Sequence, residues 1–147
     1  MDERRCLSPS IILDFGNKGL LGMQVPKRYG GLALNNQSML RVIEQLGAID
    51  PTLALFVGLN NVLGIRPILN YAPHELKEQL LPQLATGREL AAFALTEAGA
   101  GSHPFGIRSQ AAPTEEGWQL QGEKIWSGSA AWAGVTTVVA LQVNAAG

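Results

Sequence analysis

Residues 93–102 read FALTEAGAGS, and residues 122–128 read GEKIWSG. The first stretch begins as an apolar run typical of a buried strand and opens after Thr96 into a loop with glycines at positions 99 and 101. Glycine permits positive φ and close approach of the backbone, so consecutive N–H groups in this loop can converge on an anion. Trp126 adds a wide apolar face on which a flat ring can pack. The two stretches together predict a cleft for a flat, phosphorylated cofactor.

Each of these elements has a simpler interpretation when it is taken alone. A Gly-x-Gly pair is most often a tight turn between strands, and a single tryptophan is most often a core residue. The loop is not a Walker phosphate loop because no Lys-Ser or Lys-Thr follows it, and it lacks the third glycine of the dinucleotide-binding fingerprint. The order of the motifs along the chain therefore carries more weight than any one motif.

The composition is that of a globular chain without a polyanionic partner. Of its 147 residues, 46% are apolar and 16% are charged, with a formal net charge of −1 and no run of Lys or Arg. This balance argues against nucleic acid and against an anionic membrane surface as the main partner. Cys6 is the only cysteine, which excludes an internal disulfide and a cysteine-rich metal site. We expect no metal site and a reducing, cytoplasmic location.

The first half of the chain has helical spacing. Apolar residues follow a possible Asn35 cap at intervals of three or four positions, namely Met39, Val42, Ile43, Leu46 and Ile49. Asp50 and Pro51 have the order of an N-cap and a first helical residue, and they predict a second, central helix through Ile65. The apolar stretch 53–69 is interrupted by two asparagines, an arginine and a proline, so we expect it not to span a membrane.

A third, shorter helix is predicted to start near Pro73. Its expected buried stripe consists of Leu76, Leu80 and Leu84, and Pro82 is expected to kink or end it.

The second half of the chain has the spacing of strands. Strands are predicted at residues 90–95, at 107–111, after a turn at 115–117, and at 135–143. Helices followed by antiparallel-type strands indicate the α+β class, a helical bundle portion followed by a partial antiparallel sheet or barrel. The last strand is expected to leave an unpaired sheet edge.

Four short motifs occur in a fixed order between residues 19 and 143. They are GMQVPKRYGG at 22–31, LPQLATG at 81–87, LTEAGAGS at 95–102 and GEKIW at 122–126. In this order the chain resembles the acyl-CoA dehydrogenase family of FAD-dependent flavoproteins. The resemblance implies a truncated N-terminal helical domain at 1–88 and the first half of the middle β-domain at 89–147, with the family's C-terminal helical domain absent.

The resemblance also implies which residues hold FAD. Leu95 and Thr96 would face the pyrimidine edge of the flavin, and Trp126 would flank the ring together with Ser127 and Gly128. Gly101 and Ser102 would lie by the pyrophosphate. Phe93 would lie at both the flavin and the acyl-CoA substrate, and Ser102 would also contact the acyl-CoA.

The chain departs from the family pattern at two positions. The family usually has Asp after the Gly-Ser pair, where this chain has His103. It also commonly offers a Thr or Ser hydroxyl to the flavin N5 region two residues after the tryptophan, where this chain has Gly128. Ser127 or Ser129 can substitute for that hydroxyl if the register shifts by one. A missing hydrogen bond of about 0.5 to 1.5 kcal/mol would weaken flavin tuning without abolishing binding.

The function implied by the resemblance is α,β-dehydrogenation of an acyl-CoA thioester with hydride transfer to flavin N5. The family's general base lies in the C-terminal helical domain, and neither Glu97 in the loop nor Glu123 is a convincing replacement. We therefore expect this chain alone to be inactive and the complete protein to be a homo-oligomer. Two alternatives stay open: a flavin-dependent monooxygenase on the same scaffold, and a non-catalytic remnant that only associates with other subunits. Acyl chain length and the electron acceptor are also left open.

Overall fold

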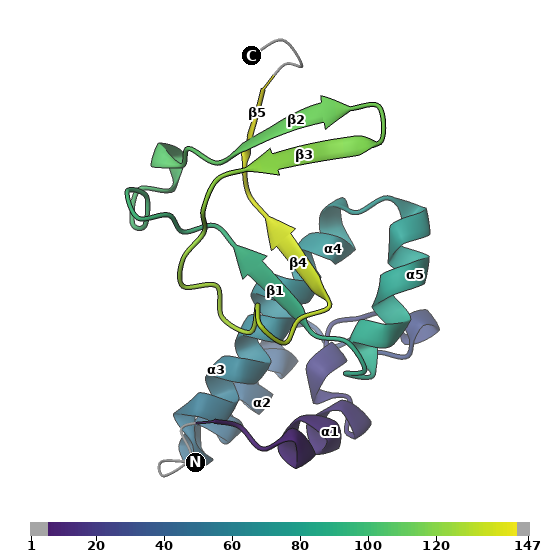
Figure 1. The fold of residues 1–147 in the computed structure, drawn as a ribbon. Coiled ribbons are helices and arrows are strands. Elements are labelled where there is room, and N and C mark those ends of the chain that lie inside the picture. Colours follow the sequence, from purple (N-terminus) through teal and green to yellow (C-terminus); the bar gives the residue numbers. More distant parts are fainter. Residues whose placement is uncertain (1–5, 144–147) are drawn as a thin grey trace.

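The computed structural model describes residues 6–143. Along the chain a group of helices is followed by strands that form two small sheets (Figure 1), which confirms the α+β class. The outer ends of the two expected domains, 1–5 and 144–147, lie outside the described residues. The helices are α1 (Pro9–Asn17), α2 (Asn36–Ile49), α3 (Pro51–Leu59), α4 (Arg66–Tyr71) and α5 (His74–Ala85). The strands are β1 (Ala91–Ala94), β2 (Gln110–Thr114), β3 (Gly117–Gln121), β4 (Val135–Val138) and β5 (Leu141–Gln142).

The two predicted helix caps are confirmed. The side chain of Asn35 accepts a hydrogen bond of 2.8 Å from Ser38 N at the start of α2. The Asp50 carboxylate accepts one of 2.7 Å from Thr52 N, and this bond holds the pKa of Asp50 below its ordinary value. Each cap satisfies a backbone N–H that has no partner within the helix, so local sequence alone fixes where α2 and α3 begin.

The central helix is longer than the sequence predicts. It continues from α3 through a π-helical segment, Asn60–Ile65, into α4, whereas the expected end was Ile65. Pro67 does not interrupt it because proline fits the first turn of α4. By length and composition the stretch Pro51–Tyr71 would suffice to cross a membrane, a test that the core helix of a globular fold also passes. Phe56, Val57 and Ile65 from this helix are buried in the fold.

Two buried asparagines join the central helix to the rest of the chain. Asn60 Nδ2 donates to Leu21 O at 2.9 Å, and its Oδ1 accepts from Ala91 N at 3.1 Å. Asn61 Oδ1 accepts from Met23 N at 2.9 Å, and its Nδ2 donates to two carbonyl oxygens, those of Leu20 and Val57, at 2.9 Å each. Because buried polar groups are stable only when they are paired, these bonds fix the position of the helix against β1 and the 20–23 loop.

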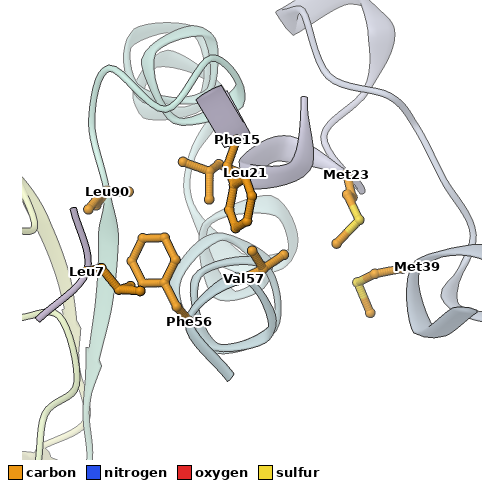
Figure 2. Close-up of a cluster of buried hydrophobic side chains, with 8 residues drawn as sticks. All are labelled: Leu7, Phe15, Leu21, Met23, Met39, Phe56, Val57 and Leu90. Atoms are coloured by element: carbon orange, nitrogen blue, oxygen red, sulfur yellow. The ribbon is translucent and has the colours of Figure 1, made fainter. Parts of the chain in front are cut away.

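The apolar core consists of two clusters. Figure 2 shows the first, in which side chains from α3 meet those of the N-terminal segments; its members are Leu7, Phe15, Leu21, Met23, Met39, Phe56, Val57 and Leu90. The second lies between α4, α5 and β1, and its members are Val25, Tyr29, Ile65, Ile68, Leu81, Leu84, Ala85 and Ala91. Both clusters include a residue next to or within β1, so the first strand is packed against the helices.

The predicted stripe of the third helix is partly wrong. Leu84 is fully buried as expected, but Leu76 is 40% exposed and Leu81 is buried in its place. The buried face is set by Ala85, which packs so closely on Gly22 that a Cβ at position 22 would overlap its backbone. Pro82 lies inside the helix, which continues to Ala85.

Strand direction differs from the antiparallel arrangement that the sequence suggested. Among the strands, only β2 and β3 are antiparallel, joined by a turn at 115–116 that lies within the predicted 115–117, whereas β1 pairs with β4 and β2 pairs with β5 in parallel. The physical reason is that a short turn permits only antiparallel pairing, while strands far apart in sequence have no such constraint. The second strand begins at Gln110 instead of 107, and the predicted strand 135–143 is split between the two sheets. Within residues 6–143 both β4 and β5 keep an outer edge without a strand partner.

Candidate functional site

A hollow of about 230 Å³ lies between the central helix, β1 and the loop after β3. Five of the predicted cofactor residues line it: Phe93, Leu95, Thr96, Trp126 and Gly128. The other lining residues are Leu59, Leu63, Ala91, Ala92, Ile125 and Ser129. The structure therefore brings the two short sequence stretches to the walls of one cavity.

Three hydrogen bonds tie these two stretches together. Ile125 N donates to Thr96 O at 2.9 Å, and Lys124 Nζ donates to Leu95 O at 2.9 Å. Lys124 Nζ also forms an ion pair of 2.7 Å with Glu97 Oε1. All three bonds leave the side-chain hydroxyl of Thr96 unused. The walls of the cavity are thus held by main-chain atoms and an ion pair, and none of these bonds uses the side chain of Thr96.

Glu97 is a structural anchor of the loop. Its carboxylate accepts from Arg108 N at 2.6 Å and from Ser109 N at 2.9 Å, and its side chain is only 10% exposed. The hydrogen bond from the Lys124 ammonium, with those from the Ser109 and Arg108 groups, lowers the pKa of Glu97 to about 2. A carboxylate with so low a pKa is a poor general base near neutral pH. Glu123 is exposed.

The segment after β3 has an unusual backbone. Trp126 has φ of 57° and Ser129 has φ of 65°, in the left-handed region that non-glycine residues seldom adopt. The Trp126 side chain is 88% exposed, so its indole forms an open wall instead of filling a core. Ser127 does not line the hollow, and among residues 6–143 its buried Oγ has no hydrogen-bond partner.

The remaining predicted residues lie in the loop at 97–102. Gly101 and Ser102 are exposed and lie outside the hollow, although a Cβ at position 101 would lie 4.0 Å from Thr96 Cγ2. Gly99 and Gly101 do not use the positive φ that glycine permits. The loop closes through hydrogen bonds between Glu97 and Ala100, N to O in both directions at 3.1 and 3.0 Å, a turn that ordinary φ values can make.

Sequence reasoning missed part of the cavity wall. Leu59 and Leu63 are four residues apart and share a helix face. The helix is apolar on nearly every side, so its sequence does not indicate which face borders a cavity. Gly64 allows this helix to approach β1, since a Cβ at position 64 would overlap the carbonyl oxygen of Ala91. Ser129 was named only as a substitute for the hydroxyl absent at Gly128.

Comparison with known sequences gives matches over nearly the whole chain. The pattern described as the acyl-CoA dehydrogenase N-terminal domain matches residues 1–88, and that of the acyl-CoA dehydrogenase middle domain matches residues 92–147. The very long-chain specific acyl-CoA dehydrogenase of Rattus norvegicus mitochondria is 40% identical over 124 residues, which cover 83% of this chain. That match covers only 19% of the rat protein, so the chain spans about a fifth of the length of this relative.

Solved structures give the same result. A glutaryl-CoA dehydrogenase from Mycobacterium smegmatis in complex with FADH2 superposes with a TM-score of 0.89 and 34% identity, covering 95% of this chain and 36% of that one. An acyl-CoA dehydrogenase from Bacillus anthracis complexed with FAD has a TM-score of 0.83 and 37% identity, covering 90% of this chain and 23% of that one.

Proposed function

This chain belongs to the acyl-CoA dehydrogenase family, and we propose that it forms the FAD-binding portion of an oxidoreductase that introduces an α,β double bond into an acyl-CoA thioester. The observation that carries this proposal is the single cavity shared by residues 93–96 and 125–129. When bound, FAD supplies the acceptor for the hydride that leaves the β-carbon of the substrate.

The residues of the cavity fit a flavin ring. Pockets for whole drug-sized ligands have volumes of about 300 to 1,000 Å³. A hollow of about 230 Å³ therefore suits one fused ring system better than an entire dinucleotide. Its lining is apolar apart from two hydroxyls, and the open indole of Trp126 offers a flat face for stacking.

The chain's own residues would bind and orient the cofactor and the substrate. Phe93, Leu95 and Thr96 line the cavity. Thr96 would offer its hydroxyl to the flavin and Leu95 its main chain, and Phe93 would border the space in which an acyl chain lies. For Gly101 and Ser102 the proposal rests on the resemblance, which assigns them to the pyrophosphate and the thioester. Both residues are exposed, and Gly101 lies near Thr96, so they would be open to a ligand that extends out of the hollow.

We further propose that the general base comes from another part of the complete protein, so that this chain alone is inactive. Glu97 has a pKa of about 2 and its oxygens are bonded to Lys124 and to two backbone amides. Loss of a general base lowers rates by about 10² to 10⁴-fold. The 147-residue chain should therefore show no acyl-CoA-dependent turnover when the full-length protein does.

The test is the visible absorption spectrum of the full-length gene product. We expect a bound flavin spectrum that bleaches anaerobically when a suitable member of a series of acyl-CoA thioesters is added. A protein that remains colourless with excess FAD would refute the cofactor assignment. A flavin that no acyl-CoA bleaches would refute the dehydrogenase reaction and favour the monooxygenase, for which the absence of a hydroxyl at Gly128 is the supporting observation.

A further inference from the structure

The flavin cavity has only two polar side chains. Its lining residues are otherwise aliphatic, aromatic or glycine, and the two exceptions are Thr96, directly after β1, and Ser129, in the loop beyond Trp126. In a mostly apolar pocket the few polar groups decide how a ligand is oriented. Two hydroxyls that come from different segments of the chain can therefore fix a ring that the apolar walls alone would leave free to turn.

Of the two serines at 127 and 129, only Ser129 lines this cavity. Gly128 has no side chain, and Ser127 keeps its Oγ buried outside the lining. The backbone determines this choice, since Ser129 has φ of 65°. Non-glycine residues rarely adopt this conformation, and strained backbone of this kind is found most often at ligand sites.

The left-handed conformation of Ser129 is held by main-chain hydrogen bonds. Its carbonyl oxygen accepts from Trp132 N and from Ala133 N, both at 2.9 Å, and Ala133 packs against the first core cluster. Ala130 N donates to Ser127 O at 3.3 Å and closes the preceding turn. These bonds use the main chain of Ser129 and not its hydroxyl, so the side chain remains available to a ligand.

We propose that Ser129 contacts the flavin and, with Thr96, sets the orientation of the ring through a hydrogen bond to its polar edge. The inference rests on the proposed function, because the ligand is the ring of FAD. A serine hydroxyl is both a donor and an acceptor, so it can pair with a ring carbonyl, a ring nitrogen or a ring N–H group.

The experiment compares Ser129→Gly with the wild type in the full-length protein. Glycine adopts positive φ without strain, so this variant can keep the backbone conformation while it removes the CH2OH side chain and with it the hydroxyl. We expect the dissociation constant for FAD, measured by flavin fluorescence, to rise about 2- to 13-fold, the factor that corresponds to one net hydrogen bond. The visible absorption maximum of the bound flavin should shift as well. Thr114→Ala, which removes a hydroxyl at the end of β2, is the control and should change neither quantity.

The outcomes separate this inference from the function on which it rests. A wild-type protein that binds no FAD would refute the proposed function and this inference with it. A wild-type protein that binds FAD, together with an unchanged affinity and spectrum in Ser129→Gly, would overturn the role of Ser129 alone. The role of Ser129 would also be overturned if Ser127→Ala changes the FAD affinity and the spectrum while Ser129→Gly changes neither.

Discussion

The helical region, residues 9–85, and the strand region, residues 91–142, differ in how they bury their apolar side chains. The largest fully buried side chains, among them Leu21, Ile65 and Leu84, all come from the helical region. In the strand region β1 is mostly buried, but every residue of β3 is exposed, and so is Trp126. Nine of the eleven residues that line the cavity come from this strand region, and Leu59 and Leu63 come from the helical region.

This difference shows how the site is positioned. Strand β1 carries residues that line the cavity, and it is fixed to the central helix by the Asn60 side chain and by the close approach at Gly64. The loop that carries Trp126 is fixed in turn to the end of β1 by Lys124 and Ile125. The site is therefore built outward from the helical core in two steps, and each step can be tested.

The largest expected effect is in the helical core. Replacing Leu84 with Ala in the 147-residue chain should lower the free energy of unfolding by about 2 to 5 kcal/mol, because Leu84 is fully buried and a cavity would remain. The matched change Leu120→Ala, at a side chain that is 56% exposed in β3, should alter it by about 0.5 kcal/mol or less. Urea unfolding measures both values. Equal losses would mean that the two regions do not differ in this way.

The next effect is at the junction of the two regions. Asn60→Ala leaves Leu21 O and Ala91 N without their partners, at about 1 to 3 kcal/mol for each buried group. Hydrogen exchange of the Ala91 amide should also become faster. The control is Asn36→Ala, since the Asn36 side chain also takes part in two hydrogen bonds, which its Oδ1 accepts from Gln24 and Arg66, but is exposed. If both variants lose the same stability, the junction has no special role.

A smaller effect should appear at the second step, where Glu97 anchors the loop. Its pKa is lowered from an ordinary 4.5 to about 2 in the folded chain, so the ionised form favours folding. This contribution is fully present above pH 4.5 and is lost as the pH falls towards 2. Glu97→Gln should therefore flatten the decrease of the unfolding midpoint over this pH range. The same substitution at the exposed Glu123 is the control, and an equal flattening there would contradict the assignment.

Features that depend on near neighbours in the sequence could be predicted, and features that depend on distant segments could not. The caps at Asn35 and Asp50 act on residues two or three positions away, so local pattern was enough to place α2 and α3. The parallel pairing of β1 with β4 joins residues more than forty positions apart, and no local signal encodes it. The stretches 93–102 and 122–128 were expected to meet in one cleft, and both contribute residues to the cavity wall. That expectation came from the order of the family's motifs along the chain and not from a local pattern.

Residues whose role depends on a distant partner were the ones that sequence reasoning misjudged. Asn60 and Asn61 look like polar interruptions of an apolar helix, but their side chains bind the chain segments that surround it. Leu76 has the right spacing for burial, yet the face of α5 that packs is decided by contact with Gly22. Which side of an element is covered is a property of the packed fold, and periodicity alone does not determine it.

The smallest effect on folding, with a clear effect on binding, is expected at Trp126. Its side chain is 88% exposed, so Trp126→Ala should change the free energy of unfolding of the chain by about 0.5 kcal/mol or less. In the full-length protein the same change removes a stacking face for the flavin, worth about 0.5 to 1.5 kcal/mol beyond simple burial, or about 2- to 13-fold in the dissociation constant for FAD. Trp118→Ala, at a tryptophan that is 58% exposed and outside the cavity, should leave FAD affinity unchanged. A Trp126 variant that retains flavin as well as the wild type would contradict the role of the indole. If FAD affinity falls in Trp126→Ala and not in Trp118→Ala, the result is the opposite of that for Leu84→Ala. Trp126 in the strand region would then contribute to binding and little to stability, whereas Leu84 in the helical region contributes to stability.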